Sequence, residues 1–150
     1  MNDKKHWYDG IFYDKLIAPN QDKMFEQIKR IVGKDNTVLD VGCGTGRLAF
    51  QLFDHCRKIV GVDLSSKNIS VAKSNHNGNF TNVDFVHGDL EEISSRVSEK
   101  FDFAILTYVI HEVPEKERLE LLSAIKNVAN KIIIGDYITP TPSSFWGKLN

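Results

Sequence analysis

The segment VLDVGCGTGRLAF, residues 38–50, constrains the fold of this chain more than any other part of its sequence. A short apolar run leads into three glycines at alternate positions, Gly42, Gly44 and Gly46, and a helical apolar pattern follows them. Glycine tolerates positive φ angles and, having no Cβ, lets a ligand lie directly against the backbone. A strand, a glycine turn and a helix in this order predict a ligand-binding unit of a parallel sheet.

The rest of the chain alternates short β-rich runs with helical patterns, which is typical of a parallel sheet built from βαβ units. We expect five strands, at residues 37–41, 58–63, 83–86, 101–107 and 131–136. Right-handed crossovers place the carboxyl ends of parallel strands at one edge of the sheet. The predicted fold is therefore α/β, Rossmann-like and doubly wound, with a mostly parallel sheet, helices on both faces and a ligand site at that edge.

A helix before the first strand is predicted to begin at an N-cap, Asn20 or Asp22, and to end at Gly33. The chain then divides into three parts. We expect an N-terminal aromatic segment with the first helix, the Rossmann-like core and the start of a C-terminal region, at residues 1–36, 37–136 and 137–150.

Composition opposes several classes of function. The 150 residues include 19 basic and 20 acidic side chains spread along the chain, a balance that argues against a nucleic-acid partner. The two cysteines, Cys43 and Cys56, lack metal-type spacing, which predicts a cytoplasmic protein without a metal site. No apolar run is long enough to predict a membrane span.

Asp40 stands two residues before the first glycine and bears on which ligand the turn accepts. This carboxylate would repel a pyrophosphate bound at the following helix, and Arg47 is the one base placed to offset it. S-adenosylmethionine has an ammonium, a sulfonium and no phosphate, so the same charge attracts it. The glycines alone leave a nicotinamide dinucleotide open, because GxGxxA is satisfied from Gly44 to Ala49.

VLDVGCGTG resembles motif I of the class I S-adenosylmethionine-dependent methyltransferases, and the resemblance runs from Val38 to Asp136. It implies that Asp63, in GVDLS, holds the ribose hydroxyls and that Asp89, in HGDLEE, holds the adenine amino group. It also implies that Thr107 lies near the methionine moiety. The implied cofactor-binding residues are Asp40, Gly42, Cys43, Gly44, Thr45, Gly46, Asp63, Leu64, Gly88, Asp89, Leu90 and Thr107.

The acidic residues also have structural interpretations. Asp63 and Asp89 are each placed to cap the helix that follows, and Asp40 as a purely structural carboxylate would need a buried partner. Cys43 is interpreted as a small filler of the turn, because the sequence places no base beside it to make a nucleophile.

The N-terminal run HWYDGIFYDKLIAPN resembles the Tyr-Asp-containing leader of small-molecule methyltransferases of the ubiquinone and menaquinone biosynthesis type. The resemblance implies that Trp7, Tyr8, Phe12 and Tyr13 lie over the cofactor. The alternative is that these aromatic residues only pack the first helix against the sheet.

The predicted function is transfer of a methyl group from S-adenosylmethionine to a small organic acceptor. His111 follows the fourth strand and is the candidate base for an acceptor that must lose a proton; a structural or exposed histidine is the alternative. Two other functions stay open, an NAD(P)-dependent oxidoreductase and a non-catalytic module that binds S-adenosylmethionine.

The chain ends at SSFWGKLN, where class I enzymes usually continue with a helix and an antiparallel strand pair. We expect this strand pair to be lacking and the edge of the fifth strand to be exposed. Such an edge predicts a homo-oligomer formed by self-association, lower stability, or loss of turnover with cofactor binding retained.

Overall fold

The computed structural model describes the backbone of residues 11–136 and the side chains of residues 21–136. Five α-helices and a short 3-10 helix alternate with five strands in the order that the sequence predicts. The elements are α1 (Ile11–Val32), β1 (Thr37–Val41), α2 (Arg47–Leu52), β2 (Lys58–Asp63), α3 (Ser66–His76), β3 (Val83–His87), α4 (Leu90–Arg96), β4 (Phe101–Thr107), η1 (Ile110–Glu112), α5 (Glu115–Val128) and β5 (Ala129–Gly135).

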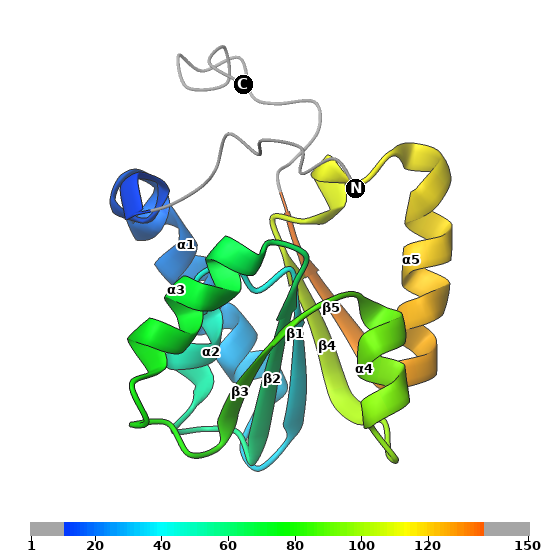
Figure 1. The fold of residues 1–150 in the computed structure, drawn as a ribbon, viewed down its shortest axis with the longest axis horizontal. Helices are drawn as coiled ribbons and strands as arrows, with labels where there is room; N and C mark the ends of the chain where they lie inside the picture. The colour runs from blue at the N-terminus through cyan, green and yellow to red at the C-terminus, as the bar shows by residue number, and fades with distance from the viewer. Residues whose placement is uncertain (1–10, 137–150) are drawn as a thin grey trace.

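The five strands form one sheet in the order β3-β2-β1-β4-β5, and every neighbouring pair is parallel. The chain builds outward from β1 to β3 and then crosses to β4 on the other side of β1 (Figure 1). The strand order therefore reverses between β1 and β4, which is where ligands bind in open α/β sheets. The predicted Rossmann-like fold is confirmed.

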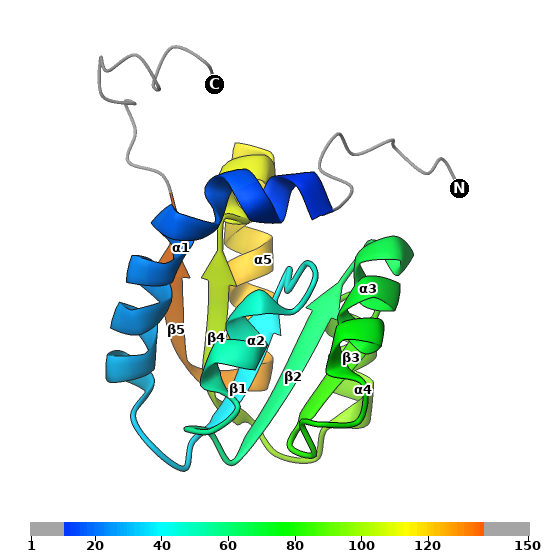
Figure 2. The same cartoon turned by 90° about the vertical axis from the view of Figure 1, so that its left-hand side faces the viewer.

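Helices cover both faces of the sheet, with α1, α2 and α3 on one face and α4 and α5 on the other (Figures 1 and 2). Two hydrophobic clusters fill the two interfaces. Neighbouring strand residues belong to different clusters, Val38 to the α1–α3 side and Leu39 to the α4–α5 side, as the two-residue period of a strand requires. The three central strands, β1, β2 and β4, are thus largely buried on both faces.

The first helix begins earlier than predicted. Asn20 and Asp22 were expected as its N-cap, and both lie inside α1, which starts at Ile11. Figure 2 shows α1 changing direction, so that its N-terminal part crosses above the carboxyl ends of the strands and the rest runs down the sheet. Pro19 gives a physical reason for the bend, because proline lacks an amide donor and crowds the preceding turn.

The other boundaries follow the prediction closely. The first, second and fourth strands have the predicted bounds, whereas β3 extends to His87 and β5 runs from Ala129 to Gly135. The helix after the glycine turn, α2, ends at Leu52. No helix within residues 11–136 is long and apolar enough to cross a membrane.

A side-chain clasp joins the amino ends of β1 and β4. The backbone N–H and the hydroxyl of Thr37 both donate to Oδ2 of Asp102, at 2.8 and 2.9 Å, and Asp102 N–H donates back to the Thr37 hydroxyl at 2.9 Å. These bonds from Thr37 hold the pKa of Asp102 below its usual value. The clasp fixes the register of the two strands whose opposite ends flank the switch point.

Thr37→Val tests the clasp, because valine keeps the shape of threonine and removes the hydroxyl. Two side-chain hydrogen bonds are lost, so the free energy of unfolding should fall by about 1–2 kcal/mol. Urea denaturation at pH 7 measures it. Thr81→Val is the control, since Thr81 is an exposed threonine at the same edge of the sheet; equal losses in both variants would contradict the role of the clasp.

Candidate functional site

The glycine turn after β1 has a backbone that other residues could not adopt without strain. Gly42, Gly44 and Gly46 have φ angles of 72°, 55° and 87°. A Cβ on Gly42 would lie 2.5 Å from Cγ2 of Val109, and a Cβ on Gly46 would lie 2.6 Å from Cζ of Phe85. The turn is therefore pressed between the loop after β4 and the side chain from β3, and only glycine fits at these two positions.

Asp63, at the end of β2, bonds to the glycine turn and to the start of the next crossover. Its Oδ2 accepts the N–H of Gly44 and its Oδ1 accepts the N–H of Ser65, both at 2.8 Å. The N-cap of α3 is Ser65, whose hydroxyl accepts the N–H of Asn68. The interpretation of Asp63 as the helix cap is therefore wrong. A carboxylate can accept about four hydrogen bonds, so the two from backbone N–H groups leave capacity for the hydroxyls of a diol.

Asp40 is buried beneath the turn with a side chain that is 1% exposed. It pairs in register with Gly61 of β2 and Ile105 of β4. Among the described residues, no group donates a hydrogen bond to either carboxylate oxygen. Burial, and to a lesser degree the charge of Asp63, raise the pKa of Asp40 to about 7. A structural carboxylate would have a buried partner, and no residue among those described supplies one.

Cys43 fits its interpretation as a filler of the turn. Its side chain is buried in the cluster beneath α1–α3. Burial raises the pKa of the thiol far above its usual value, and the nearby charges of Asp40 and Asp63 raise it further. A thiol of this kind stays protonated and is a poor nucleophile.

The end of β3 supplies Asp89, which has the capping role that the sequence left open. Its Oδ1 accepts the N–H groups of Glu91 and Glu92 at 2.9 and 3.0 Å, so Asp89 caps α4. Those two bonds use one oxygen of the carboxylate. The Leu64 side chain, directly after Asp63, is 77% exposed and offers an apolar surface to a ligand. Gly88 N–H donates to the Asp63 carbonyl at 3.1 Å and ties the two strand ends together.

The end of β4 leads from Thr107 into η1 and brings His111 against the end of β5. Tyr108 has a positive φ of 58°, and its N–H donates to the carbonyl of Gly135 at 2.8 Å. His111 Nδ1 lies 2.7 Å from Oδ1 of Asp136, and the His111 backbone N–H donates to Oδ2 of the same carboxylate at 3.0 Å. The pairing with Asp136 was not predicted. The signal available in the sequence was the position of both residues just past parallel strands that end at one edge.

Arg47 is turned toward α1. It donates to Oε1 of Gln21 at 2.5 Å and to Oδ1 of Asp22 at 2.9 Å, and its guanidinium lies over the ring of Phe25. The base that could offset a pyrophosphate is therefore already engaged by the first helix. This arrangement weakens the dinucleotide interpretation of the glycine turn.

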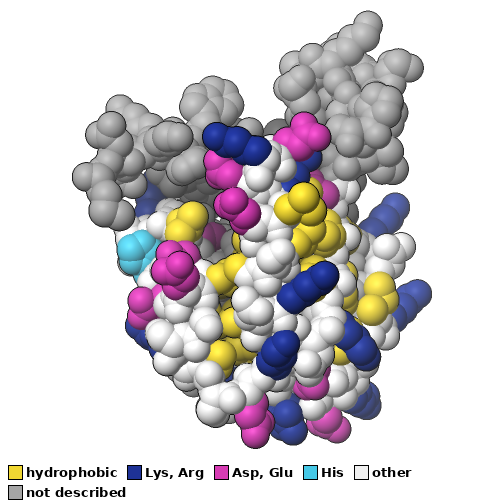
Figure 3. Space-filling model, turned by 90° about the vertical axis from the view of Figure 1, so that its right-hand side faces the viewer, with side chains coloured by type: hydrophobic (Ala, Val, Ile, Leu, Met, Phe, Trp, Pro, Cys, Tyr) yellow, Lys and Arg dark blue, Asp and Glu magenta, His cyan; other side chains and the backbone are white. Residues whose placement is uncertain are grey.

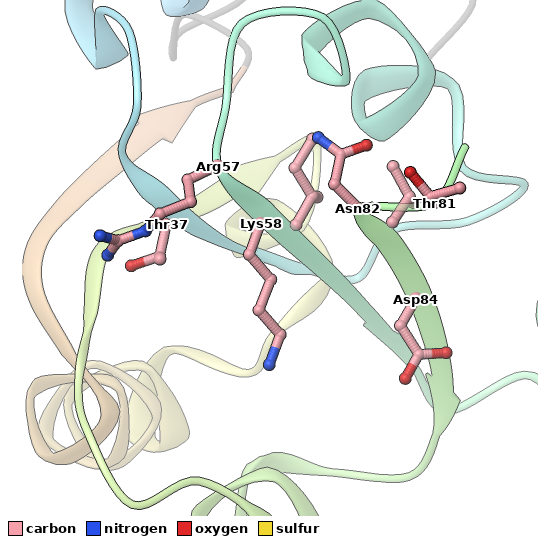
Figure 4. A pocket seen from close by; sticks show the side chains of 8 residues that line it. Thr37, Arg57, Lys58, Thr81, Asn82 and Asp84 are labelled. Carbon is pink, nitrogen blue, oxygen red and sulfur yellow. The ribbon is translucent and has the colours of Figure 1, made fainter.

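A hollow of ≈ 530 Å³ lies at the opposite, amino edge of the sheet, lined by Thr37, Arg57, Lys58, Ile59, Thr81, Asn82, Val83 and Asp84 (Figure 4). Two of the polar side chains that line this hollow have structural roles. Thr37 belongs to the clasp, and Nδ2 of Asn82 donates to the carbonyls of Phe53 and Cys56. The carboxyl edge, which gathers Asp40, Asp63, Asp89 and His111, is the better candidate site.

The structure brings the predicted residues of four strand ends to this one edge. The N-terminal part of α1, which contains Phe12 and Tyr13, crosses above it (Figure 2). Trp7 and Tyr8 lie outside the described residues, as do residues 137–150.

Comparisons with known proteins give one consistent answer. The sequence profile of a family described as "Methyltransferase domain" matches residues 38–131. The ubiquinone biosynthesis O-methyltransferase of Coxiella burnetii is 35% identical over 114 residues, which are 76% of this chain and 45% of that protein. The O-antigen chain terminator bifunctional methyltransferase/kinase WbdD of Escherichia coli is 28% identical over 132 residues, 83% of this chain and 18% of that protein.

Solved structures agree on the fold. The magnesium protoporphyrin IX methyltransferase ChlM of Synechocystis PCC 6803, solved with bound S-adenosylmethionine, has a TM-score of 0.68 at 20% identity, covering 89% of this chain and 64% of that one. The chain thus spans less than half the length of the Coxiella relative and under two thirds of this structural neighbour.

Asp40→Asn tests the buried charge, because asparagine keeps the shape of the protonated acid. The pKa of Asp40 rises from 3.8 to about 7 on folding, so the native state binds a proton more tightly than the unfolded state. Wild-type stability should therefore fall as pH rises between these values, and the variant should escape that loss. We expect the free energy of unfolding of the variant to exceed that of the wild type by an amount that grows up to about pH 7 and then stays constant at about 1–3 kcal/mol. The Tm of the variant should be higher accordingly.

Thermal unfolding followed by circular dichroism between pH 5 and pH 8.5 measures this difference. Asp84→Asn is the control, because Asp84 is an exposed aspartate on β3. A Tm difference that does not change with pH, or the same change in the control, would contradict the buried charge.

Proposed function

Because the chain belongs to the class I S-adenosylmethionine-dependent methyltransferases, we propose that it binds S-adenosylmethionine at the carboxyl edge of its sheet and transfers the methyl group to a small organic acceptor. The observation that carries the proposal is the Asp40 carboxylate, buried and without a hydrogen-bond donor among the described residues. Such a group is costly unless a cation or a donor comes to it, and a phosphate would increase the cost. A cationic nucleoside is the ligand class that fits.

The surrounding residues fit the rest of this ligand. Gly44 has open space where a Cβ would lie, so a ligand can lie against the backbone there, and Asp63 has acceptor capacity for a ribose diol. We assign the cofactor to Asp40, Gly42, Cys43, Gly44, Thr45, Gly46, Asp63, Leu64, Gly88, Asp89, Leu90 and Thr107. When bound, S-adenosylmethionine supplies a methyl group on a sulfonium, which is a good leaving group. The chain's own tasks are then to align the acceptor and exclude water.

The N-terminal part of α1 is placed for the exclusion of water, since it crosses above the strand ends (Figure 2). Helix α1 is joined to the first turn of α2 by hydrogen bonds that Arg47 donates to Gln21 and Asp22. Gln21 is a buried polar residue, so this link is a specific one.

The names of similar proteins support the proposal. One is named an O-methyltransferase and the structural neighbour was solved with S-adenosylmethionine bound. Neither the oxidoreductase nor the non-catalytic module has support from these comparisons. The engagement of Arg47 by α1 further disfavours a dinucleotide.

Partners and location are part of the proposal. On the face in Figure 3, Lys and Arg side chains are mixed with Asp and Glu, which supports a small-molecule acceptor over nucleic acid. Within residues 11–136, β5 pairs with β4 alone and its Ile134 is 46% exposed, which supports self-association at this edge. The buried free thiols of Cys43 and Cys56 support a cytoplasmic location.

Asp63→Ala should weaken binding of S-adenosylhomocysteine by about 1–3 kcal/mol, because a diol loses charge-assisted hydrogen bonds. Isothermal titration calorimetry of the whole chain measures the change, with NAD as the competing ligand class. Asp84→Ala, on the neighbouring strand, is the matched control. Unchanged affinity in Asp63→Ala, or binding of NAD in place of S-adenosylhomocysteine, would overturn the assignment.

Binding of S-adenosylmethionine should strengthen with pH up to about 7 and then level off, because Asp40 attracts a cation only when ionised and its pKa lies near 7. Calorimetry from pH 5.5 to 8.5, in buffers of different ionisation enthalpy, should also detect proton release on binding. Asp40→Asn should bind more weakly and without this dependence. A flat profile in the wild type would contradict the role of Asp40.

A further inference from the structure

We propose that Asp136 is a positioning residue that holds His111 in the tautomer able to take a proton from a hydroxyl acceptor, which makes the acceptor atom an oxygen. The inference rests on the proposed methyl transfer and deepens it. It starts from one observation, that a single carboxylate contacts both the ring and the backbone of the same histidine.

The two contacts determine how the imidazole is held. Oδ2 of Asp136 accepts the backbone N–H of His111 at 3.0 Å, and Oδ1 lies 2.7 Å from ring Nδ1. An ionised carboxylate only accepts hydrogen bonds, so the ring proton at this contact belongs to Nδ1. In the neutral imidazole the lone pair then lies on Nε2, which becomes the atom able to take up a proton.

Backbone contacts fix the position of the pair formed by His111 and Asp136, here called the dyad. The N–H of Tyr108 donates to the carbonyl of Gly135, which joins the ends of β4 and β5 three residues before His111 and one residue before Asp136. Asp136 has an 11% exposed side chain, whereas the His111 side chain is 37% exposed. The carboxylate is therefore the less exposed member of the pair and the imidazole is the more exposed one, as proton transfer from a bound acceptor to His111 requires.

The dyad also lies on the same side of the molecule as the predicted cofactor turn. Val109, two residues before His111, fills the space that a Cβ on Gly42 would occupy. The segment that carries His111 is thus packed against the first glycine of the turn. A base at this place adjoins the switch point between β1 and β4.

Two carboxylates face the imidazole. Asp136 contacts Nδ1, and Oε1 of Glu112 lies 3.9 Å from Nε2. An imidazolium formed by proton transfer would therefore lie beside two opposite charges.

The chemistry balances for a hydroxyl acceptor. The acceptor oxygen gives its proton to Nε2 and forms a bond to the methyl carbon, while the electron pair of the broken S–CH₃ bond returns to sulfur and leaves a neutral thioether. The imidazolium then releases the proton to water. A phenol or other weakly acidic hydroxyl is a poor nucleophile until it loses this proton, whereas an amine attacks through an existing lone pair. A histidine held for proton uptake therefore favours oxygen.

The first test measures the tautomer and needs no turnover. The full chain has 5 histidines, so ¹⁵N-histidine NMR with His111→Gln identifies the His111 signals. In the wild type with S-adenosylhomocysteine we expect the Nδ1–H tautomer, and in Asp136→Asn a mixture or the Nε2–H form. Asp54→Asn is the control, because its carboxylate also accepts a side-chain bond, from Lys29, at a distant turn. An Nε2–H tautomer in the wild type would overturn the proposal.

The second test measures methyl transfer to two probes, catechol and the more acidic 4-nitrocatechol, which is ionised at the assay pH. His111→Gln and Asp136→Asn should lower kcat for catechol by about 10²-fold or more, with little change in KM, and should affect 4-nitrocatechol less. Equal losses for both probes would overturn the role of the dyad.

Two further outcomes separate this inference from the function on which it rests. Methylation of aniline but not of catechol, or no transfer to either catechol probe with S-adenosylhomocysteine bound, would overturn the oxygen acceptor and leave the cofactor site standing. Failure to bind S-adenosylhomocysteine would overturn the proposed function itself. Normal binding by Asp136→Asn would show that this variant is folded.

Discussion

The parallel pairing of β1 with both β2 and β4 is the constraint on which the site depends. It places Asp40 in register between Gly61 and Ile105, at a level where the sheet is covered on both faces. Gly61 has no room for a side chain, since a Cβ would lie 2.8 Å from the ring of Phe85 and 2.9 Å from Sγ of Cys43. The close packing that shields Asp40 from solvent is therefore the same packing that holds the glycine turn above it. A buried charge and an open backbone cradle are two results of one strand arrangement.

The electrostatic balance of the edge follows from this packing. Asp40 and Asp63 lie close enough for each charge to oppose the other, and Arg47 is directed to Gln21 and Asp22 on α1. A site with this excess of negative charge is less stable when empty than a neutral one would be. On the proposed function, a cationic ligand would relieve that repulsion, and this relief would contribute to its binding free energy.

The sequence predicted the parts of this structure that local pattern controls. Strands β1, β2 and β4 have the predicted bounds because each is a short apolar run between turn residues, whereas β3 and β5 lie at the sheet edges, where pairing partners decide the ends. The start of α1 was missed because Asn20 and Asp22 are favoured N-cap residues, whereas here they lie inside a bent helix that begins before Pro19. The pair of His111 and Asp136, 25 residues apart, depends on which strand lies beside β4. No local pattern encodes that adjacency.

The position of the switch point explains how one edge can serve two chemistries. On the β1–β3 side Asp63 joins three strand ends, because its side chain accepts the N–H of Gly44 and its carbonyl accepts the N–H of Gly88. On the β4–β5 side the site consists of a few residues on η1 and at a strand end, held mainly through Asp136. The two halves meet where Val109 packs on Gly42. On the proposal that the acceptor lies on the β4–β5 side, a change of acceptor would require changes in the loop after β4 and at the end of β5, while the charge beneath the turn could stay the same.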